Sequence, residues 1–419
     1  MSKIVFRGGE IDGETSPPPS KSHTHRALFL ASMAQGRSVL GNCLLSADTL
    51  ATIDACRAMG ASVSVDGDTA TVDGGNLSAP TVPVDAKNSG TTMRIFTGLC
   101  SMFDRPVTIT GDDSLKKRPM GPLLEALESC GVTCASNGGL PPVTVQGPNR
   151  GGSVSIKGSV SSQFITSLLL TAPMLKGGSI ITVEGGMVSA PYLDVTTHMM
   201  RLFGADATRD GNVFTVASTG YRPYDYFVPA DYSSSAFPLV AGALGGRCTA
   251  SGMDPSDPQG DKRIMDILAQ AGAKVRVEGR SATVERSELN ACEIDMGSIP
   301  DLFPVVAVLL STAKGESRLY GAPQLRFKES DRIETTVRMI NDLGGDARGT
   351  DDGCIIRGVP RLRGGRVVHH GDHRIMMSAA VASIVCDGPV SMDDPECAAV
   401  SYPGFPAAMA KIGLKSEAE

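Results

Sequence analysis

Two series of helical patterns alternate along the whole chain. In the first series a polar cluster opens a run of residues that is apolar on every side, and these openings recur about every 70 residues. The openings lie at Ser22, Thr91, Ser161, Ser233, Asp301 and His373. A helix that is apolar all round is buried all round. The pattern therefore predicts six buried helices, one in each of six repeated units.

The second series consists of helical stretches that end at glycine. Their ends lie at Gly60, Gly131, Gly204, Gly272, Gly344 and Gly413. In the clearest copy Asp48 is a suitable helix cap, and two alternating segments flank an Asp-Gly-Asp turn at 61–73. This stretch predicts a helix followed by a β-hairpin. Each unit thus combines an amphipathic helix, a hairpin and a buried helix, and six units fit an α/β protein with two lobes of three.

The length of the chain supports a division into two domains. A chain of 419 residues exceeds what one core usually holds and suits two domains of about 200 residues. We expect one lobe at 17–228 and a second lobe formed by 1–16 together with 229–419, so that the chain crosses over twice at a hinge. The proline run at 17–19 is stiff enough for a hinge strand, and the alternative is that it only ends a surface loop.

Composition and charge exclude several classes of function. The net charge of −6 argues against a nucleic-acid or anionic-membrane binder, which would carry a basic surplus. The N-terminus has no apolar stretch of signal-peptide length, and the apolar helices near 165–175 and 302–313 are too short to cross a bilayer. The ten cysteines form no C-x-x-C pair and no zinc-spaced cluster with histidine. We therefore expect buried thiols in a reducing cytoplasm and no metal site.

Basic residues gather at the openings of the first half. Lys21 and Arg26 flank Ser22, and Gly90 precedes Arg94 at the second opening. A helix N-terminus offers free N–H groups and partial positive charge, and glycine lets backbone amides approach an anion closely. Each opening alone could be an ordinary cap, and the charged loop at 112–118 could be a solvated charge run. Together, side-by-side openings in two facing lobes would hold a polyanionic ligand.

Two further charged segments lie in the second half. Residues 326–332, RFKESDR, place five charges in seven residues at the start of a helix, with Lys328 and Arg332 one turn apart. A surface ion-pair ladder is the alternative for this segment. The sequence Gly-Asp-His-Arg at 371–374 enters a buried helix and contains more charge than capping requires. Asp301 and Glu329 supply two carboxylates whose surroundings differ, which suits paired acid and base roles.

In this order and spacing, the motifs resemble those of the 5-enolpyruvylshikimate-3-phosphate synthase family. They are SKSHTHR, NSGTTMR, LKKRP, SVSSQF, RFKESDR and GDHR, and they cover essentially the whole chain. The first two resemble archaeal members more than bacterial ones. The resemblance implies an α/β enolpyruvyl transferase fold, an inside-out barrel whose two lobes each hold three βαβαββ units around parallel buried helices, with the site between them.

The family transfers the enolpyruvyl group of phosphoenolpyruvate to the 5-hydroxyl of shikimate 3-phosphate and releases phosphate, without metal or cofactor. The resemblance implies catalytic roles for Asp301, Glu329 and Lys21. It implies shikimate 3-phosphate binding by Lys21, Ser22, Arg26, Ser161, Ser162, Gln163, Ser189, Asp301, Gln324 and Lys328, with Tyr192 nearby. It implies phosphoenolpyruvate binding by Lys21, Asn88, Gly90, Arg118, Gln163, Arg332 and Arg374. We expect a cytoplasmic monomer of the shikimate pathway with these two small molecules as partners, and no nucleic acid or membrane.

The chain departs from the family pattern at three positions. Val400 stands where many members have a lysine that contacts phosphoenolpyruvate, Gln324 replaces a common asparagine, and Ile95 replaces a common proline. These changes leave glyphosate sensitivity open. One alternative is the sister UDP-N-acetylglucosamine enolpyruvyl transferase, which usually has a reactive cysteine in the loop matching 112–118, where this chain has none. A non-catalytic anion-binding protein on the same scaffold is the other, and retention of both carboxylates argues against it.

Overall fold

The computed structural model describes residues 2–418, which divide into two compact units. One unit, here called the middle unit, is Pro19–Val228; the other, the split unit, combines the chain up to Pro18 with the chain from Pro229 onward. The first boundary thus falls inside the proline run at 17–19, two residues beyond the expected position. Each unit has its own hydrophobic core.

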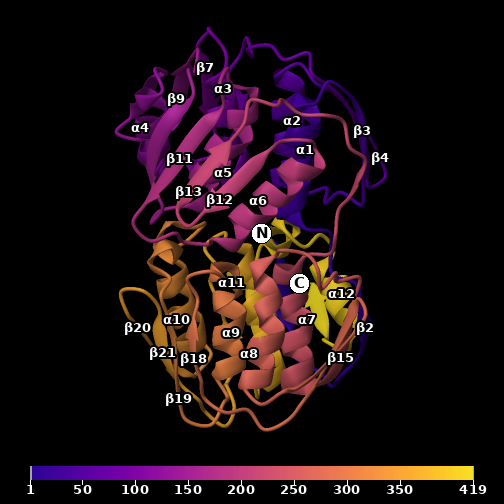
Figure 1. Cartoon of the computed structure of the whole chain (residues 1–419). Helices are drawn as coiled ribbons and strands as arrows, with labels where there is room; N and C mark the ends of the chain where they lie inside the picture. Colours follow the sequence, from indigo (N-terminus) through magenta and orange to yellow (C-terminus); the bar gives the residue numbers. More distant parts are fainter. Residues whose placement is uncertain (1, 419) are drawn as a thin grey trace. The chain divides into compact units, whose positions relative to one another are not determined.

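The middle unit contains the first six helices (Figure 1). Three of them are buried along nearly their whole length: α1 (Lys21–Met33), α3 (Gly90–Cys100) and α5 (Ser162–Thr171). Three outer helices alternate with them: α2 (Ala47–Ala58), α4 (Gly121–Ser129) and α6 (Pro191–Leu202). Short 3₁₀ turns occur at η1 (Leu115–Lys117) and η2 (Ala172–Met174). Phe29 of α1 stacks on Phe96 of α3, and α3 packs against α5, so the buried helices form the centre of the unit.

Three four-stranded sheets surround these helices. Their strand orders are β14-β3-β5-β4, β6-β7-β9-β8 and β10-β11-β13-β12. The strands are β3 (Gly36–Gly41), β4 (Ser62–Asp66), β5 (Thr69–Gly74), β6 (Val84–Asp85), β7 (Val107–Thr110), β8 (Thr133–Asn137), β9 (Leu140–Gln146), β10 (Gly152–Lys157), β11 (Ser179–Glu184), β12 (Ala207–Asp210), β13 (Val213–Val216) and β14 (Tyr226–Phe227). In each sheet the first pair is parallel and the others are antiparallel. This is the βαβαββ unit, and β14 completes the first sheet from the far end of the unit.

The split unit repeats the arrangement. Its buried helices α7 (Tyr232–Gly245), α9 (Phe303–Leu310) and α11 (His373–Ala382) pack on one another. Its outer helices are α8 (Ile264–Gln270), α10 (Arg332–Asp342) and α12 (Phe405–Lys411). The 3₁₀ turns are η3 (Gly260–Arg263), η4 (Pro300–Leu302), η5 (Pro323–Phe327), η6 (Ser383–Val385) and η7 (Pro395–Val400). Six predicted buried helices are therefore confirmed across the two units.

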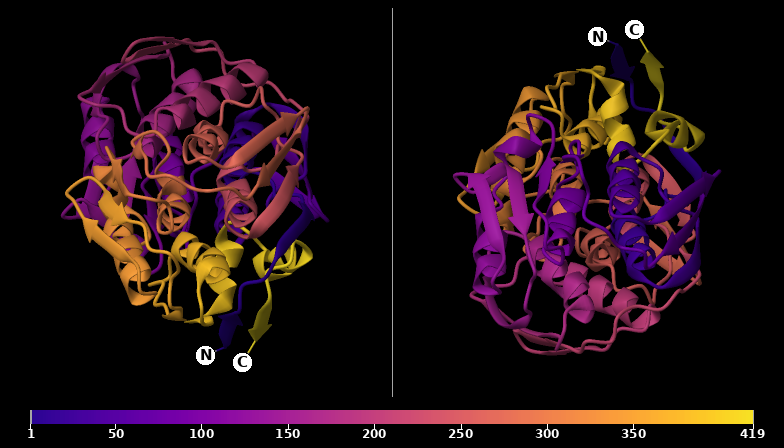
Figure 2. Two further views of the ribbon diagram at one scale, coloured as in Figure 1. Left: turned by 90° about the horizontal axis from the view of Figure 1, so that it is seen from below. Right: turned by 90° about the horizontal axis from the view of Figure 1, so that it is seen from above.

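Two sheets of the split unit depend on strands that are distant in sequence. The sheet orders are β16-β17-β15-β2, β18-β19-β21-β20 and β22-β23-β1-β24. The strands are β1 (Lys3–Phe6), β2 (Ile11–Thr15), β15 (Gly246–Ser251), β16 (Lys274–Glu278), β17 (Ser281–Glu285), β18 (Glu293–Asp295), β19 (Glu316–Tyr320), β20 (Asp346–Gly349), β21 (Cys354–Arg357), β22 (Gly365–Arg366), β23 (Val390–Asp393) and β24 (Ser416–Ala418). Strand β2 pairs in parallel with β15, and β1 lies between β23 and β24, which brings the two chain ends side by side (Figure 2).

The glycines that end the outer helices have left-handed backbones. Gly60 has φ 103° and Gly272 has φ 102°, and the other four are also positive. Only glycine adopts this conformation without strain, so it stops the helix and turns the chain into the hairpin. The helix before Gly60 begins differently from the prediction. Ser46 caps α2 in a capping box with Thr49, which leaves Asp48 inside the first turn.

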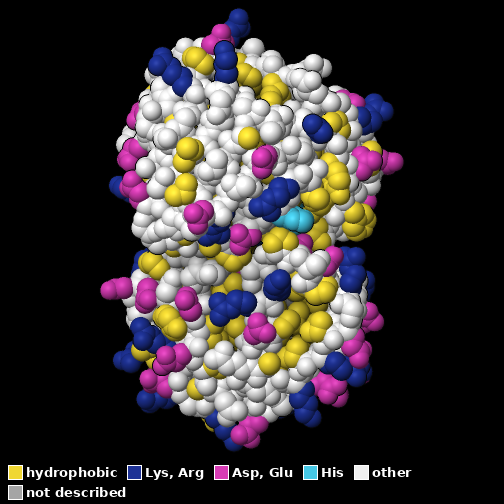
Figure 3. Space-filling model, in the orientation of Figure 1, with side chains coloured by type: hydrophobic (Ala, Val, Ile, Leu, Met, Phe, Trp, Pro, Cys, Tyr) yellow, Lys and Arg dark blue, Asp and Glu magenta, His cyan; other side chains and the backbone are white. Residues whose placement is uncertain are grey.

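The drawn face of each unit shows acidic and basic side chains interspersed (Figure 3). Binding of an anion therefore depends on local clusters rather than on a general field. Across residues 2–418 no helix combines the length and apolar character needed to cross a membrane. The same residues contain no group of three His, Cys, Asp or Glu side chains arranged for a metal ion.

Candidate functional site

The N-terminus of α1 contributes two cations to the middle unit. Lys21 is the first residue of α1, and its Nζ contacts Asp48 Oδ2 at 3.0 Å. Both side chains are largely buried, so the outer helix α2 holds this ammonium group in place. The displacement of the helix cap to Ser46 is what frees Asp48 for this contact. The sequence pattern placed Lys21 at the opening but gave no sign of its partner.

Arg26 lies one turn further along α1 and is 2% exposed. Its Nε donates to Thr196 Oγ1 at 2.9 Å, its Nη1 donates to the Ser22 carbonyl at 2.9 Å, and its Nη2 donates to the Tyr192 carbonyl at 3.2 Å. All of these acceptors are neutral. Burial lowers the pKa of Arg26 to about 10, which still leaves it charged at neutral pH. A buried cation held only by neutral oxygens favours an anionic ligand nearby.

A second cluster forms where α3 and α5 begin. Gly90 opens α3, and a Cβ at this position would lie 3.2 Å from Arg118 Nη1. Gln163 donates from Nε2 to Thr91 Oγ1 at 2.8 Å and accepts from Arg94 Nη1 at 2.8 Å. The structure thus brings together the predicted residues Gly90, Arg118 and Gln163. The NSGTTMR motif contains Arg94, but the sequence pattern does not indicate its contact with Gln163.

Arg118 is tied to the predicted Asn88. Its Nη2 donates to Asn88 Oδ1 at 2.7 Å, and its Nη1 donates to the Asn88 carbonyl at 3.2 Å. The Nε of this 7% exposed arginine has no hydrogen-bond partner among the described residues. An unsatisfied guanidinium donor beside a helix N-terminus is suited to an anion.

The predicted serines also lie at helix starts. Ser161 caps α5 by accepting from the Gln163 backbone N–H at 3.3 Å, and Arg94 Nη1 lies 3.4 Å from the same hydroxyl. Ser162 is the first residue of α5 and is buried. Ser189, also buried, has φ 54° just before α6. Capping and ligand binding are compatible for these hydroxyls, because each has one donor and two acceptor sites.

In the split unit the predicted Arg332 is surrounded by three carboxylates. Its Nη1 donates to Asp301 Oδ1 at 2.9 Å, its Nη2 to Glu329 Oε2 at 2.6 Å, and its Nε to Asp372 Oδ2 at 2.9 Å. Arg332 is 1% exposed and Asp372 is fully buried. Burial by itself would lower the pKa of Arg332, but the three carboxylates outweigh it and raise that pKa. This arginine therefore fixes the positions of Asp301 and Glu329, the two carboxylates expected to act as acid and base.

Asp301 is held between two arginines. Its Oδ2 accepts from Arg374 Nη2 at 2.8 Å, while Oδ1 accepts from Arg332. Burial would raise the pKa of Asp301, but the charges of Arg374, Lys328 and Arg332 outweigh it and hold that pKa well below the usual range. Asp301 is therefore a carboxylate at any pH near neutrality. Lys328 is near enough to Asp301 to contribute to this effect.

The segment that carries Lys328 and Glu329 differs from its predicted form. Helix α10 begins only at Arg332, and Lys328–Asp331 form a link between η5 and α10. The prediction that Lys328 and Arg332 share a helical turn is wrong, because Asp331 caps the helix by accepting from the Glu334 N–H at 3.1 Å. Because Glu329 lies outside the helix, its side chain accepts a hydrogen bond from Arg332 Nη2 and also lines a cavity of about 290 Å³.

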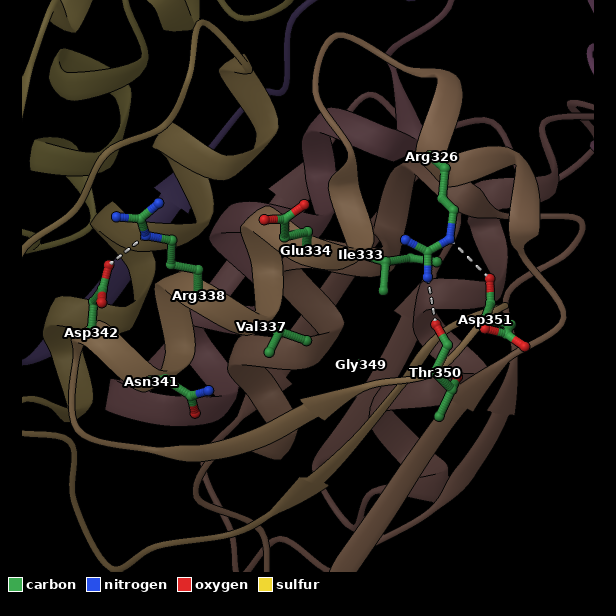
Figure 4. Close-up of a pocket in the computed structure, with 10 residues that line it drawn as sticks. All are labelled: Arg326, Ile333, Glu334, Val337, Arg338, Asn341, Asp342, Gly349, Thr350 and Asp351. Atoms are coloured by element: carbon green, nitrogen blue, oxygen red, sulfur yellow. Dashed lines mark hydrogen bonds and ion pairs between the residues drawn. The ribbon is translucent and has the colours of Figure 1, made fainter.

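Arg326, in η5 just before this segment, bonds to Thr350 and Asp351 (Figure 4). Its Nε donates to the Asp351 carbonyl at 3.1 Å, its Nη2 donates to the Thr350 carbonyl at 2.8 Å, and its Nη1 donates to Asp331 Oδ2 at 2.8 Å. These contacts join the link to the turn between β20 and β21. They lie in a groove of about 600 Å³ along α10 that the sequence did not indicate.

The structure shows what surrounds Gln324 and Val400, two of the positions that depart from the family pattern. Gln324 is buried, its Nε2 donates to the Gly297 carbonyl at 3.0 Å, and its Oε1 has no partner among the described residues. Val400 ends η7, three residues after Cys397. Burial raises the pKa of the Cys397 thiol to about 12, helped by Asp372 and Glu329, so η7 lies beside the carboxylate cluster. Val400 is apolar, so it supplies no positive charge beside the carboxylate cluster.

The fold and these residues define a class of protein: a two-unit α/β protein of repeated βαβαββ units, with arginines and carboxylates clustered near the starts of its helices. A family model described as EPSP synthase (3-phosphoshikimate 1-carboxyvinyltransferase) matches residues 5–409. The chain belongs to the EPSP synthase family.

Several full-length relatives support this assignment. The 3-phosphoshikimate 1-carboxyvinyltransferase of Methanocorpusculum labreanum is 46% identical over 421 residues, covering all of both chains. That of Aeropyrum pernix is 41% identical, covering 99% of this chain and 97% of its own. A solved EPSP synthase from Acinetobacter baumannii is 28% identical, covers all of both chains and has a TM-score of 0.83. The predicted family, including its archaeal character, and the predicted fold are confirmed.

Proposed function

We propose that the chain transfers the enolpyruvyl group of phosphoenolpyruvate to the 5-hydroxyl of shikimate 3-phosphate and releases phosphate. The observation that carries this proposal is the arrangement around Arg332, which holds Asp301 and Glu329 on neighbouring nitrogens within one unit. The reaction requires one group to accept a hydroxyl proton and another to protonate a carbon. Family membership supports the substrates, because the relatives carry the name of this activity.

Each group of residues has a proposed ligand. We assign the phosphate and ring of shikimate 3-phosphate to Lys21, Ser22, Arg26, Ser161, Ser162, Gln163 and Ser189, with Asp301, Gln324 and Lys328 for the ring hydroxyls. We assign phosphoenolpyruvate to Lys21, Asn88, Gly90, Gln163, Arg118, Arg332 and Arg374. The two ligands carry two phosphates and two carboxylates, which arginine matches in bidentate geometry.

The chemistry proceeds by addition and elimination. In the addition, Asp301 accepts the proton of the 5-hydroxyl and the hydroxyl oxygen bonds to C2 of phosphoenolpyruvate. The C2–C3 double bond opens at the same time, and Glu329, which enters this step as the protonated acid, donates its proton to C3. In the elimination, Glu329 takes a proton back from the new methyl group, the C2–C3 double bond forms again, and the C2–O bond to phosphate breaks. Lys21 assists by donating a proton to the leaving phosphate. We assign the base role to Asp301 because the surrounding cations hold it anionic, and the role of acid to Glu329.

A carboxylate with so low a pKa is a weak base while both arginines hold it. Phosphoenolpyruvate would compete for the N–H groups of Arg374 and Arg332, because its oxygens are also anionic acceptors. Loss of those hydrogen bonds would raise the pKa of Asp301. Binding of the second substrate therefore makes Asp301 a better base when it is needed. Because Val400 stands where many family members have a lysine, we assign the binding of phosphoenolpyruvate here to Arg374 and Arg332.

Phosphate release from the purified protein tests the proposal. With both substrates present we expect release that depends on each of them, and Glu329→Gln should lower kcat by about 100-fold or more while shikimate 3-phosphate still binds. Calorimetric titration of shikimate 3-phosphate measures the binding. Binding without phosphate release in the unmodified protein would favour a non-catalytic anion-binding protein. Equal loss of binding and turnover in E329Q would make Glu329 only a structural ion-pair partner.

A cytoplasmic location and a monomeric state belong to the same proposal. Sedimentation of the purified protein with and without both substrates measures the oligomeric state.

A further inference from the structure

A chain of hydrogen bonds between buried side chains joins three helices of the middle unit. His25 Nδ1 in α1 lies 2.6 Å from Thr52 Oγ1 in α2, and that oxygen lies 2.7 Å from Thr92 Oγ1 in α3. The Thr92 hydroxyl donates in turn to Ser89 Oγ at 2.7 Å. All four residues are fully buried. None of them has a role in the chemistry above, although burying polar groups is costly unless each is hydrogen-bonded.

The donors in this chain can be ordered, because each hydroxyl has only one proton. The Thr92 proton goes to Ser89 Oγ, and another neighbour of this hydroxyl, the Asp48 carbonyl at 3.3 Å, can only accept. Thr52 must therefore donate to Thr92, and His25 must donate to Thr52 from Nδ1. His25 Nε2 has no hydrogen-bond partner among the described residues, which agrees with a nitrogen that has no proton to donate. Burial lowers the pKa of His25 well below its usual value, and nearby cations lower it further, so the ring is neutral.

One end of the chain lies at a helix start that we assign to phosphoenolpyruvate. Ser89 is the N-cap of α3 and also accepts a hydrogen bond from the Thr92 backbone N–H at 3.1 Å. Gly90 follows this cap, and Asn88, which accepts from Arg118, precedes it. The position of the cap therefore decides where these proposed phosphoenolpyruvate ligands lie.

The other end of the chain lies near the start of α1. His25 is one helical turn after Lys21, and Thr52 is one turn after Asp48, whose Oδ2 accepts from Lys21 Nζ at 3.0 Å. These helices also pack through apolar side chains, but apolar contacts are non-directional, whereas hydrogen bonds fix both a distance and an angle. The chain therefore fixes the start of α3 relative to Lys21.

We propose that Thr52 is a positioning residue for phosphoenolpyruvate. Its single hydroxyl accepts from His25 and donates to Thr92, so it joins α1 to the cap of α3 through the outer helix α2. It acts through the helix starts and takes no part in bond making. This inference rests on the proposed function, because phosphoenolpyruvate is the ligand assigned to Lys21 and Gly90.

Steady-state kinetics of Thr52→Val test the proposal, because valine keeps the shape of threonine but has no hydroxyl. We expect KM for phosphoenolpyruvate to rise about ten-fold and kcat to stay within about two-fold, since a displaced cap weakens the hold on this ligand before and during the reaction alike. KM for shikimate 3-phosphate should change far less, because most of its proposed ligands lie on α1, α5 and the start of α6. Thr52→Ser keeps the hydroxyl, so its KM for phosphoenolpyruvate should stay within about two-fold of that of the unmodified protein.

Thr97→Val is the matched control. Thr97 is also a fully buried threonine, and its Oγ1 donates to the Met93 carbonyl within the same helix, α3, at 2.7 Å. Both variants lose a buried hydroxyl, so both should lower the Tm of the ligand-free protein, but only T52V should raise KM for phosphoenolpyruvate. If Thr52 served only to stabilise the fold, T52V and T97V would differ in Tm but not in KM.

Nitrogen-15 spectra of the histidine rings give a readout that needs no activity. In the ligand-free protein at neutral pH we expect His25 to carry a proton on Nδ1 and none on Nε2, and His25→Asn identifies its signals by their loss. A proton on Nε2 would mean that Thr52 donates to His25 and cannot donate to Thr92. That result would break the chain and overturn the inference.

The outcomes separate this inference from the proposed function. If the unmodified protein releases no phosphate, calorimetric titration of phosphoenolpyruvate measures the hold directly. Weaker binding in T52V than in T97V would then support the inference although the proposed function fails. If turnover is normal and T52V and T97V have the same KM for phosphoenolpyruvate, or if KM is as high in T52S as in T52V, the inference is wrong. If T52V does not fold, Thr92→Val decides, because it breaks the same hydrogen bond from the other side: a raised KM supports the inference and an unchanged KM overturns it.

Discussion

At the scale of single residues, one buried arginine holds three carboxylates together in the split unit. Arg332 donates to Asp301, Glu329 and Asp372, while Arg374 supplies a second ion pair to Asp301. Three carboxylates brought close together repel one another strongly unless a cation lies between them. The geometry of both proposed catalytic carboxylates therefore depends on a side chain that sequence motifs would assign only to substrate.

Replacing this arginine should destabilise the fold. Arg332→Met leaves three carboxylates near one another without their shared partner, and we expect a loss of about 3–5 kcal/mol in the free energy of unfolding. Urea unfolding measures it. Arg357→Met is the control, because Arg357 pairs with Glu316 on the surface and its loss should cost less than about 1 kcal/mol. An equal small loss in both variants would show that the buried cluster tolerates the missing charge.

At the scale of elements, the same position in each repeat serves two purposes. The first turn of a buried helix must satisfy free N–H groups, and in α1, α3 and α5 it also holds Lys21, Gly90 and Ser162. The exception is the link before α10, which holds Glu329 outside any helix. Because this link has no helical hydrogen bonds of its own, its shape depends on Arg326.

A substitution that disturbs the link between η5 and α10 should lower the rate of catalysis without weakening substrate binding. Arg326→Gln loses the fork that joins the link to the turn after β20, so Glu329 should be displaced and kcat should fall by about 10–100-fold. Shikimate 3-phosphate should bind with nearly the same Kd, since most of its proposed ligands belong to the middle unit. Steady-state kinetics and calorimetry measure the two effects. Arg338→Gln, on the same groove, is the control and should leave kcat nearly unchanged. A kcat for R326Q equal to that of R338Q would remove Arg326 from this role.

At the scale of the whole molecule, each unit is completed by strands from distant parts of the chain. Strand β14 completes the first sheet of the middle unit, and β1 is an inner strand of the last sheet of the split unit. The chain therefore closes the split unit only when its two ends meet. Pairings over such sequence separations form late because their loop closure is entropically costly.

Because β1 completes the split unit, a substitution in β1 should destabilise the split unit and not the middle unit. Val5 is buried and pairs with both Ser391 and Glu417, so Val5→Pro should remove ladder hydrogen bonds from an inner strand and cost about 3 kcal/mol or more. Amide hydrogen exchange should then speed up in β23 and β24. Exchange in β3 and α1 of the middle unit serves as the internal control. Equal acceleration in both units would mean that they unfold as one cooperative body.

The sequence alone determined the repeat, the six buried helices and the glycines that end the outer helices, because these depend on local periodicity and backbone freedom. It also determined the order of the polar openings, and through their resemblance the family. Only the tertiary structure decided which polar side chains meet: Lys21 with Asp48, Arg94 with Gln163, Arg332 with three carboxylates, and Asp261 with Ser233. Such pairs join residues on different elements, and a hydrophobic pattern records the burial of each element but not its polar neighbours.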